Sequence, residues 1–162
     1  MSADFYPIDL DGHALAIMPR PRAGEWLEDE IAHWQRRGVQ VVVSMLEPSE
    51  VADLGLQKEA QLCAKQGIDF LSFPIPDRGV PPKPALLDDF LTPLVARLKA
   101  GDSIAVHCRA GIGRSALVAA CMLARAGVLY ERIFPAISRA RGLEVPDTKE
   151  QEQWTQTFAR RR

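Results

Sequence analysis

The most informative stretch of this chain is residues 103–125, SIAVHCRAGIGRSALVAACMLAR. It begins with a short apolar run, Ser103–His107, which has the length and composition of a buried strand. Glycines interrupt the following residues, Cys108–Arg114, and predict a loop. The remainder, Ser115–Arg125, is rich in alanine and other apolar residues and predicts a buried helix. A strand, a loop and a helix therefore follow one another directly.

Strands and helices alternate on both sides of this stretch. We expect strands at Ala14–Met18, Val39–Met45 and Ile68–Phe73, and helices at Glu25–Arg37, Leu56–Gln66, Ala85–Lys99, Tyr130–Arg141 and Thr148–Arg160. Ser49 is expected to cap a further short helix, and Pro74–Pro84 is too rich in proline and glycine for regular structure. The pattern predicts an α/β fold with a central, mostly parallel sheet flanked by helices. The 162 residues show no linker or repeat, so we expect a single domain over residues 1–162.

Composition excludes several classes of function. The formal net charge is −1, so no overall field favours nucleic acid or a membrane surface. The N-terminus has no secretory pattern, and no apolar run is long enough to span a bilayer. The three cysteines, Cys63, Cys108 and Cys121, show no disulfide or zinc-site spacing, and we expect no metal. A reducing, cytoplasmic setting is the resulting expectation.

The loop after Ser103–His107 is suited to bind an anion. It lies where a strand's carboxyl end meets a helix N-terminus, the position at which open α/β sheets bind ligands. Backbone N–H groups and the helix dipole would face the ligand, and the glycines permit the required turns. We predict a phosphate-binding loop formed by Arg109, Ala110, Gly111, Ile112, Gly113 and Arg114.

The side chains of the loop add chemistry to this anion site. An anion cradle favours the thiolate of Cys108, which makes it the expected nucleophile. Arg114 can bind two phosphoryl oxygens at once through its guanidinium group. Ser115 could hydrogen-bond the Cys108 sulfur, and His107, on the opposite face of the strand, could order the loop through backbone carbonyls. Cys63 and Cys121 are expected to be core residues.

This loop resembles the His-Cys-x5-Arg-Ser/Thr motif of the protein tyrosine phosphatase superfamily. The resemblance implies the protein tyrosine phosphatase fold and a cysteinyl-phosphate mechanism without a metal or other cofactor. Residues 76–81, Pro-Asp-Arg-Gly-Val-Pro, resemble the superfamily's general-acid loop, Trp-Pro-Asp-x-Gly-x-Pro, with Ile75 in place of the tryptophan. Asp77 would then be the general acid and later the base that activates water.

A third stretch, Thr148–Trp154, is similar to the family's late helix start, Thr-x-x-Gln-x-x-Phe. Gln151 would lie near the loop and help to position water, although a plain place on the helix surface is an open alternative. Asp147 stands where tyrosine-specific members often carry a further glutamine. The chain is most similar to compact, dual-specificity-like members, particularly the group containing the cyclin-dependent kinase-associated phosphatase.

The sequence therefore predicts a cysteine-dependent phosphatase that acts on a phosphorylated protein or peptide. Phosphotyrosine is the expected target, and dual specificity is left open. Phosphoinositide phosphatases of the superfamily tend to carry Cys-Lys-x-Gly-Lys, and here Arg109 and Ile112 occupy the two lysine positions. A phosphoinositide or inositol-phosphate phosphatase is the first alternative, and a non-catalytic phospho-binding module is the second. The sequence gives no basis for predicting an oligomeric state.

Overall fold

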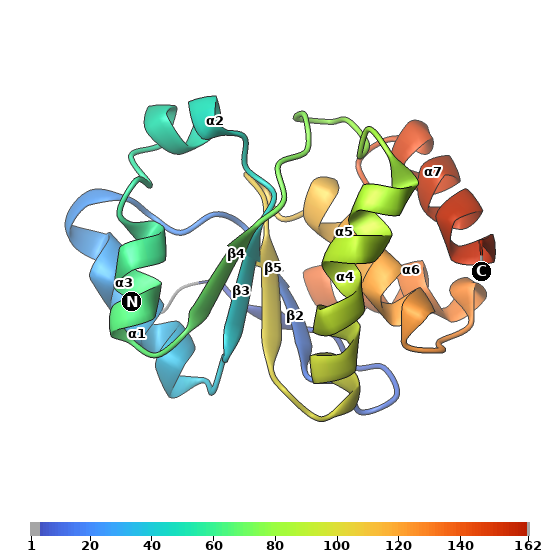
Figure 1. Ribbon diagram of the computed structural model, residues 1–162, viewed down its shortest axis with the longest axis horizontal. Helices are drawn as coiled ribbons and strands as arrows, with labels where there is room; N and C mark the ends of the chain where they lie inside the picture. The colour runs from blue at the N-terminus through green and yellow to red at the C-terminus, as the bar shows by residue number, and fades with distance from the viewer. Residues whose placement is uncertain (1–3, 162) are drawn as a thin grey trace.

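A five-stranded sheet runs through the middle of the protein, with helices on both faces (Figure 1). The computed structural model describes residues 4–161. The strands are β1 (Tyr6–Pro7), β2 (Leu15–Met18), β3 (Val41–Ser44), β4 (Asp69–Ser72) and β5 (Ile104–His107). Their order across the sheet is β1-β2-β5-β3-β4. All neighbouring strands are parallel except β1 and β2, so the predicted α/β fold with a mostly parallel sheet is confirmed.

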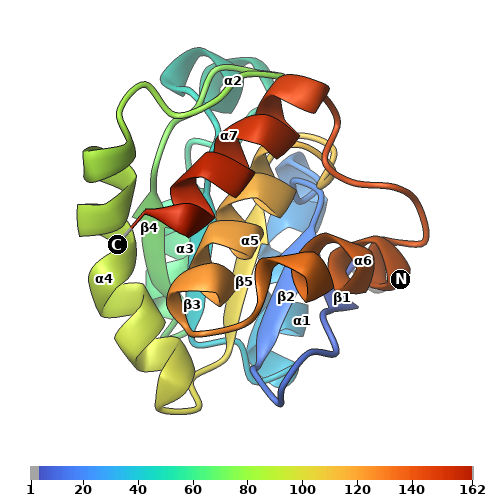
Figure 2. The same ribbon diagram turned by 90° about the vertical axis from the view of Figure 1, so that its right-hand side faces the viewer.

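Two helical layers cover the sheet. One face carries α1 (Leu27–Arg36), preceded by the short helix η1 (Gly24–Trp26), and α3 (Glu59–Lys65), while α2 (Pro48–Asp53) lies beyond the sheet's end. The other face carries α4 (Pro84–Lys99), α5 (Arg114–Arg125), α6 (Tyr130–Arg141) and α7 (Lys149–Arg160). Figure 2 shows this second layer in front of the sheet. Within residues 4–161, no helix has the length and hydropathy needed to cross a membrane.

β5 is the central strand, and its side chains alternate between two cores. Ile104, Val106 and Cys108 belong to the larger core under α4–α7. Ala105 belongs to the smaller core under α1 and α3. Since side chains alternate along a strand, His107 falls on the same side as Ala105. His107, which ends β5, and Cys108, which begins the loop, are thus held by different helical layers.

The structure corrects two local expectations. Ser49 does not cap the short helix: α2 begins at Pro48, Glu47 is the N-cap residue, and Ser49 lies inside the helix. Proline is preorganised for the first helical position, which moves the start of the helix one residue earlier. The predicted helix Leu56–Gln66 begins later, at Glu59. Strand β1 was not predicted, because two residues are too short to show a pattern.

Candidate active site

The candidate site lies at the carboxyl end of β5, where residues 108–113 lead into α5. A pocket of about 240 Å³ opens there. It is lined by Asp77, Arg78, Cys108, Arg109, Ala110, Ile112, Gly113, Arg114, Asp147 and Gln151. Of the residues predicted from sequence, His107, Gly111 and Ser115 do not line the pocket. The structure thus brings together three motifs that are far apart in the chain.

Cys108 sits at the base of this arrangement, 2% exposed. Its Sγ lies 3.2 Å from the Oγ of Ser115, which is fully buried in the first turn of α5. A hydroxyl at this distance can donate a hydrogen bond to a thiolate. Burial raises the pKa of Cys63 to about 12, and the nearby Glu59 carboxylate adds to this; burial likewise raises the pKa of Cys121. Both therefore remain inert thiols in the core.

Four consecutive carbonyl groups of the 108–113 loop point to partners that lie outside the pocket. The contacts are His107 Nδ1 to Cys108 O at 3.3 Å, Arg20 N to Arg109 O at 3.1 Å, Arg141 Nη2 to Ala110 O at 3.4 Å and Arg141 Nε to Gly111 O at 2.8 Å. In a planar trans peptide the N–H points opposite to the C=O. The N–H groups of residues 109–112 therefore turn toward the pocket, and they form a cradle for an anion.

Two glycines are required by this packing. Gly111 has φ +72°, and a Cβ there would lie 2.6 Å from the carbonyl carbon of Met18 at the end of β2. Gly113 has ordinary φ, but its Cβ would lie 3.0 Å from the Asp147 Cβ and from the Gln151 amide. Any side chain at these positions would push the loop away from β2 or from the start of α7.

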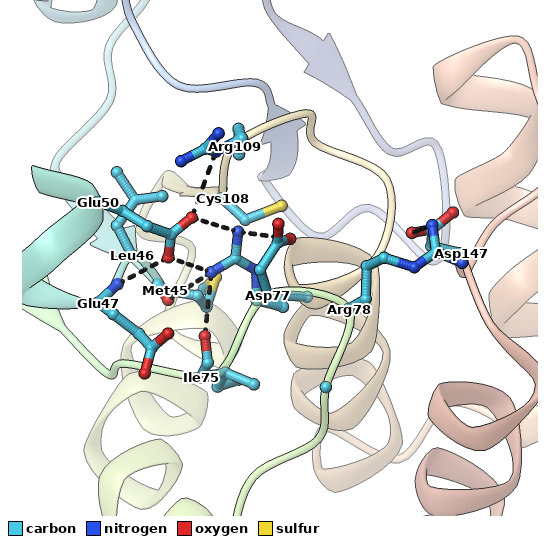
Figure 3. Close-up of polar contacts among 12 residues, drawn as sticks. Met45, Leu46, Glu47, Glu50, Ile75, Asp77, Arg78, Cys108, Arg109 and Asp147 are labelled. Carbon is cyan, nitrogen blue, oxygen red and sulfur yellow. Dashed lines mark hydrogen bonds and ion pairs between the residues drawn. The ribbon is translucent and has the colours of Figure 1, made fainter. Parts of the chain in front are cut away.

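Arg114 is 2% exposed and is held mainly by Glu50 of α2. Its two terminal nitrogens donate to the two Glu50 oxygens at 2.6 and 2.9 Å, and Nη1 also donates to the Ile75 carbonyl at 3.0 Å. Glu50 and Asp77, both labelled in Figure 3, each accept a hydrogen bond from this group. Within the part of the chain that the structure describes, the Nε–H has no hydrogen-bond partner and is left for a bound anion, whereas the second N–H of Nη2 donates to Asp77. Glu50 was missed by the sequence analysis.

Glu50 and Arg114 each stabilise the charged form of the other. Burial alone would favour the neutral acid, but hydrogen bonds from Arg114 and the Glu47 backbone hold the pKa of Glu50 below its usual value. Burial also opposes the charge on Arg114, yet the hydrogen bonds to Glu50 keep the pKa of Arg114 above its usual value. Glu50 also lies 3.4 Å from Arg109 Nε. The cation over the pocket is therefore fixed in place and permanently charged.

Asp77 projects from the 76–81 loop, and its side chain is 57% exposed. Its Oδ1 accepts a hydrogen bond from Arg114 Nη2 at 3.1 Å. The next residue, Arg78, has φ +60° and donates from Nη1 to Asp147 Oδ2 at 2.9 Å. This conformation is uncommon for a residue with a side chain, and the ion pair ties it to the start of α7. The carboxylate thus reaches the pocket from a loop that is anchored on one side.

Gln151 is fully buried beside the pocket, so its interpretation as a plain helix-surface residue is wrong. Its Oε1 accepts from the backbone N–H groups of Asp147 and Thr148, both at 3.1 Å. Its Nε2 donates to the Gly79 carbonyl at 3.1 Å. The Nε2 atom thus joins α7 to the 76–81 loop, while Oε1 closes the capping box at the start of α7. Thr148 caps α7, as the sequence predicted.

His107 lies behind the loop and contacts Glu59 of α3, at 2.6 Å between Nε2 and Oε2. Neither Glu59 nor Arg141 was found by the sequence analysis, although each contacts the loop or its supporting histidine. One signal was present for Glu59, because it precedes the buried Cys63 by four residues and so shares its helix face. A charged residue on such a face needs a partner. For Arg141 the sequence holds no such signal.

Glu50→Gln should destabilise the fold at neutral pH by about 1–3 kcal/mol, because it removes the charge from a buried hydrogen-bonded pair. The folded pKa of Glu50 is lowered, so its stabilisation is full at neutral pH and is lost as the pH falls through that pKa. The difference between wild type and variant should therefore shrink toward acid pH. Urea unfolding from pH 7 to pH 3 measures this difference.

Glu28→Gln, at an exposed pair with Lys65, is the control and should change stability by less than about 0.5 kcal/mol. A Glu50→Gln difference that does not vary with pH would contradict the assignment.

Comparisons with known proteins agree with this geometry. Residues 16–128 match the family described as "Polymorphic toxin system, DSP-PTPase phosphatase". Protein tyrosine phosphatase type IVA 2 of Mus musculus is 39% identical over 69 residues, which are 41% of this chain and 41% of that protein. The chain thus aligns with less than half the length of this relative.

Solved structures show the same fold over nearly the whole chain. Kinase associated phosphatase (KAP) with its catalytic cysteine replaced by serine has a TM-score of 0.86 at 20% identity, covering 100% of this chain and 99% of that one. Tk-PTP in its active form has a TM-score of 0.75 at 25% identity, covering 98% and 97%. Because the family match covers most of the chain, we conclude that this protein belongs to the DSP-PTPase phosphatases, within the protein tyrosine phosphatase superfamily.

Proposed function

We propose that this protein is a cysteine-dependent phosphatase that removes phosphate from a phosphorylated protein or peptide through a cysteinyl-phosphate intermediate. One observation carries the proposal: the buried Cys108 thiol opens a loop whose outward carbonyls turn its N–H groups toward a pocket that also holds Arg114 and Asp77. A nucleophile, an anion cradle, a fixed cation and an acid are thereby within reach of one phosphoryl group.

The reaction would proceed as two in-line displacements. The Cys108 thiolate attacks phosphorus while Asp77 protonates the leaving oxygen, so that an S–P bond forms and a P–O bond breaks. Arg114 and the loop N–H groups stabilise the charge on the equatorial oxygens. Water, activated by Asp77, then attacks the cysteinyl phosphate, and Ser115 assists the departing sulfur. Since Nε2 donates to the Gly79 carbonyl and Oε1 caps α7, we assign Gln151 to anchoring the 76–81 loop at the start of α7; the second N–H of Nε2 is the donor that could help to position water.

The charges at the rim favour a substrate with a single phosphate group. Arg109 is paired with Glu50, and Arg78 is paired with Asp147. Ile112 lines the pocket where a second loop cation would be needed for an inositol polyphosphate. We therefore propose a phosphoprotein substrate, with phosphotyrosine as the first candidate and dual specificity as the second. The three free thiols are compatible with a reducing compartment, and we propose the cytoplasm.

Hydrolysis of p-nitrophenyl phosphate tests the proposed function directly. We expect turnover that vanadate inhibits and EDTA leaves unchanged. A panel of phosphotyrosine, phosphoserine and phosphothreonine peptides, together with inositol phosphates, then identifies the substrate class. Binding of a phosphopeptide without any turnover would instead identify a non-catalytic module, and preferential hydrolysis of inositol phosphates would overturn the phosphoprotein proposal.

Asp77→Ala should lower kcat by about 10²–10⁴ on phenyl phosphate, whose leaving group requires a proton. The loss on p-nitrophenyl phosphate should be much smaller, because p-nitrophenolate departs without protonation. Steady-state kinetics on the two substrates give this ratio. Asp89→Ala, an exposed carboxylate of α4 outside the pocket, is the matched control and should retain both activities. Equal losses on the two substrates would exclude Asp77 as the general acid.

A further inference from the structure

A glutamate and a histidine are buried together behind the 108–113 loop, on the face of the sheet opposite to the pocket. The His107 side chain is 0% exposed and that of Glu59 is 2% exposed. Their Nε2–Oε2 distance is 2.6 Å, and the other ring nitrogen, Nδ1, lies 3.3 Å from the Cys108 carbonyl oxygen. The imidazole therefore bridges helix α3 and the first peptide group of the loop.

The partners of the ring determine where its protons lie. A carbonyl oxygen can only accept, so the contact with Cys108 O requires a proton on Nδ1. The short contact with Glu59 requires a second proton between Nε2 and Oε2, on either atom. In histidine, the hydrogen bond made by one ring nitrogen sets the state of the other. Glu59 thus secures the far end of the ring, so that Nδ1–H faces the loop.

Among residues 4–161, His107 is the only hydrogen-bond partner of the Glu59 carboxylate. Trp34 of α1 packs near the imidazole, with 6.3 Å between ring centroids, and the Cys63 thiol lies close to the carboxylate. The neighbouring core cluster is formed by apolar side chains of α1, α3 and the sheet. Replacing both members of a buried pair by apolar residues is often neutral or stabilising, whereas removing one member leaves the other unpaired and is costly. Stability is therefore a weak reason for the Glu59–His107 pair as a whole.

We propose that Glu59 is a positioning residue for catalysis, acting through His107 on the 108–113 loop. Holding the Cys108 carbonyl behind the loop turns the N–H of Arg109 toward the pocket, because the two groups belong to one peptide unit. This N–H is the first donor of the anion cradle. Glu59 touches neither substrate nor thiol, and its effect on turnover is indirect. The inference rests on the proposed phosphatase function.

Two variants at position 59 separate positioning from folding. Glu59→Leu removes the partner of Nε2 but preserves apolar packing, and it should lower kcat on p-nitrophenyl phosphate about tenfold or more. Its melting temperature should fall, because His107 Nε2 is left buried without a partner, so kcat is measured at a temperature where the variant is folded. Glu59→Gln should recover most of kcat, because its amide can donate to Nε2 and leave the proton on Nδ1 for the Cys108 carbonyl.

Asp88→Leu is the control, because it makes the same kind of replacement, a carboxylate by leucine, at a different place. It breaks an ion pair with Arg125 at the end of α5, far from the loop. Its kcat should equal that of wild type. Nitrogen-15 NMR of the wild-type protein, which has three histidines, should show Nδ1 of His107 protonated. This measurement does not depend on any variant.

A folded Glu59→Leu protein with wild-type kcat would overturn the proposal, and so would an unprotonated Nδ1 in the wild-type protein. A Glu59→Gln protein as impaired as Glu59→Leu would also overturn it. Failure of the proposed function would look different, because the wild-type protein itself would then not hydrolyse p-nitrophenyl phosphate.

Discussion

Cys108→Ser should abolish turnover of p-nitrophenyl phosphate, with a loss on the order of 10⁴–10⁶ in kcat. A serine hydroxyl is nearly isosteric with the thiol but is not ionised at neutral pH, so the attack on phosphorus is lost while the pocket stays intact. The 3.2 Å contact with Ser115 can be retained by a hydroxyl. The variant should therefore remain folded and bind inorganic phosphate with nearly unchanged affinity, which calorimetry measures.

Cys121→Ala is the matched control for this experiment, since it removes a buried thiol on α5 that does not line the pocket. It should retain turnover. Mass spectrometry of wild-type protein quenched in acid should find one phosphoryl group on the peptide that contains Cys108. Wild-type activity in Cys108→Ser, or a phosphoryl group on another residue, would remove the nucleophile from the proposed mechanism.

Arg114→Lys should lower kcat/KM by about 10²–10⁴, although it keeps the positive charge. Lysine is a point charge with three donors on one nitrogen and cannot reproduce a planar fork. In the wild-type protein, separate N–H groups serve Glu50, the Ile75 carbonyl and the pocket. The lysine ammonium can satisfy Glu50 or a bound phosphoryl group, but not both in the observed geometry.

Arg125→Lys, at the other end of α5, provides the comparison, because this arginine also forms a two-pronged pair with a carboxylate, Asp88. We expect its kcat/KM to match wild type. Circular dichroism should be recorded for both variants, since in Arg114→Lys Glu50 loses at least one of the two hydrogen bonds that it accepts from residue 114. A folded Arg114→Lys protein with wild-type kinetics would show that charge alone, without the fork, suffices at this position.

The pocket could be predicted from sequence as far as its residues follow one another in the chain. Cys108, Arg114 and Ser115 belong to one loop and helix start, so their spacing carries the information. Asp77 could be predicted because its own motif surrounds it. The supporting residues have no such local pattern: Glu50 lies 64 residues before Arg114, and Glu59 lies 48 residues before His107. Only the folded arrangement, with α2 beyond the end of the sheet and α3 packed against β4, brings them to the loop.

The helices and strands, like the site residues, could be predicted only where the signal is local in the chain. Periodicity was sufficient for the long helices, and Tyr130–Arg141 was predicted with the observed bounds. It was insufficient at the ends of short elements, where a single capping interaction decides the boundary. Glu47 and Pro48 together set the start of α2, and neither contributes to apolar periodicity. Strand β1 pairs through only two residues, so its existence depends on the neighbouring strand rather than on its own side chains.

The pairing of charges around the pocket has a consequence for how fast a substrate is found. Arg78 and Arg109 each have a carboxylate partner, and Arg114 has two. Such a surface projects little potential into solvent, so a phosphorylated partner is not drawn in from a distance. Encounter should proceed at the unsteered rate of about 10⁵–10⁶ M⁻¹s⁻¹ and depend weakly on ionic strength. Selection among phosphoproteins would then rest on contacts made after collision.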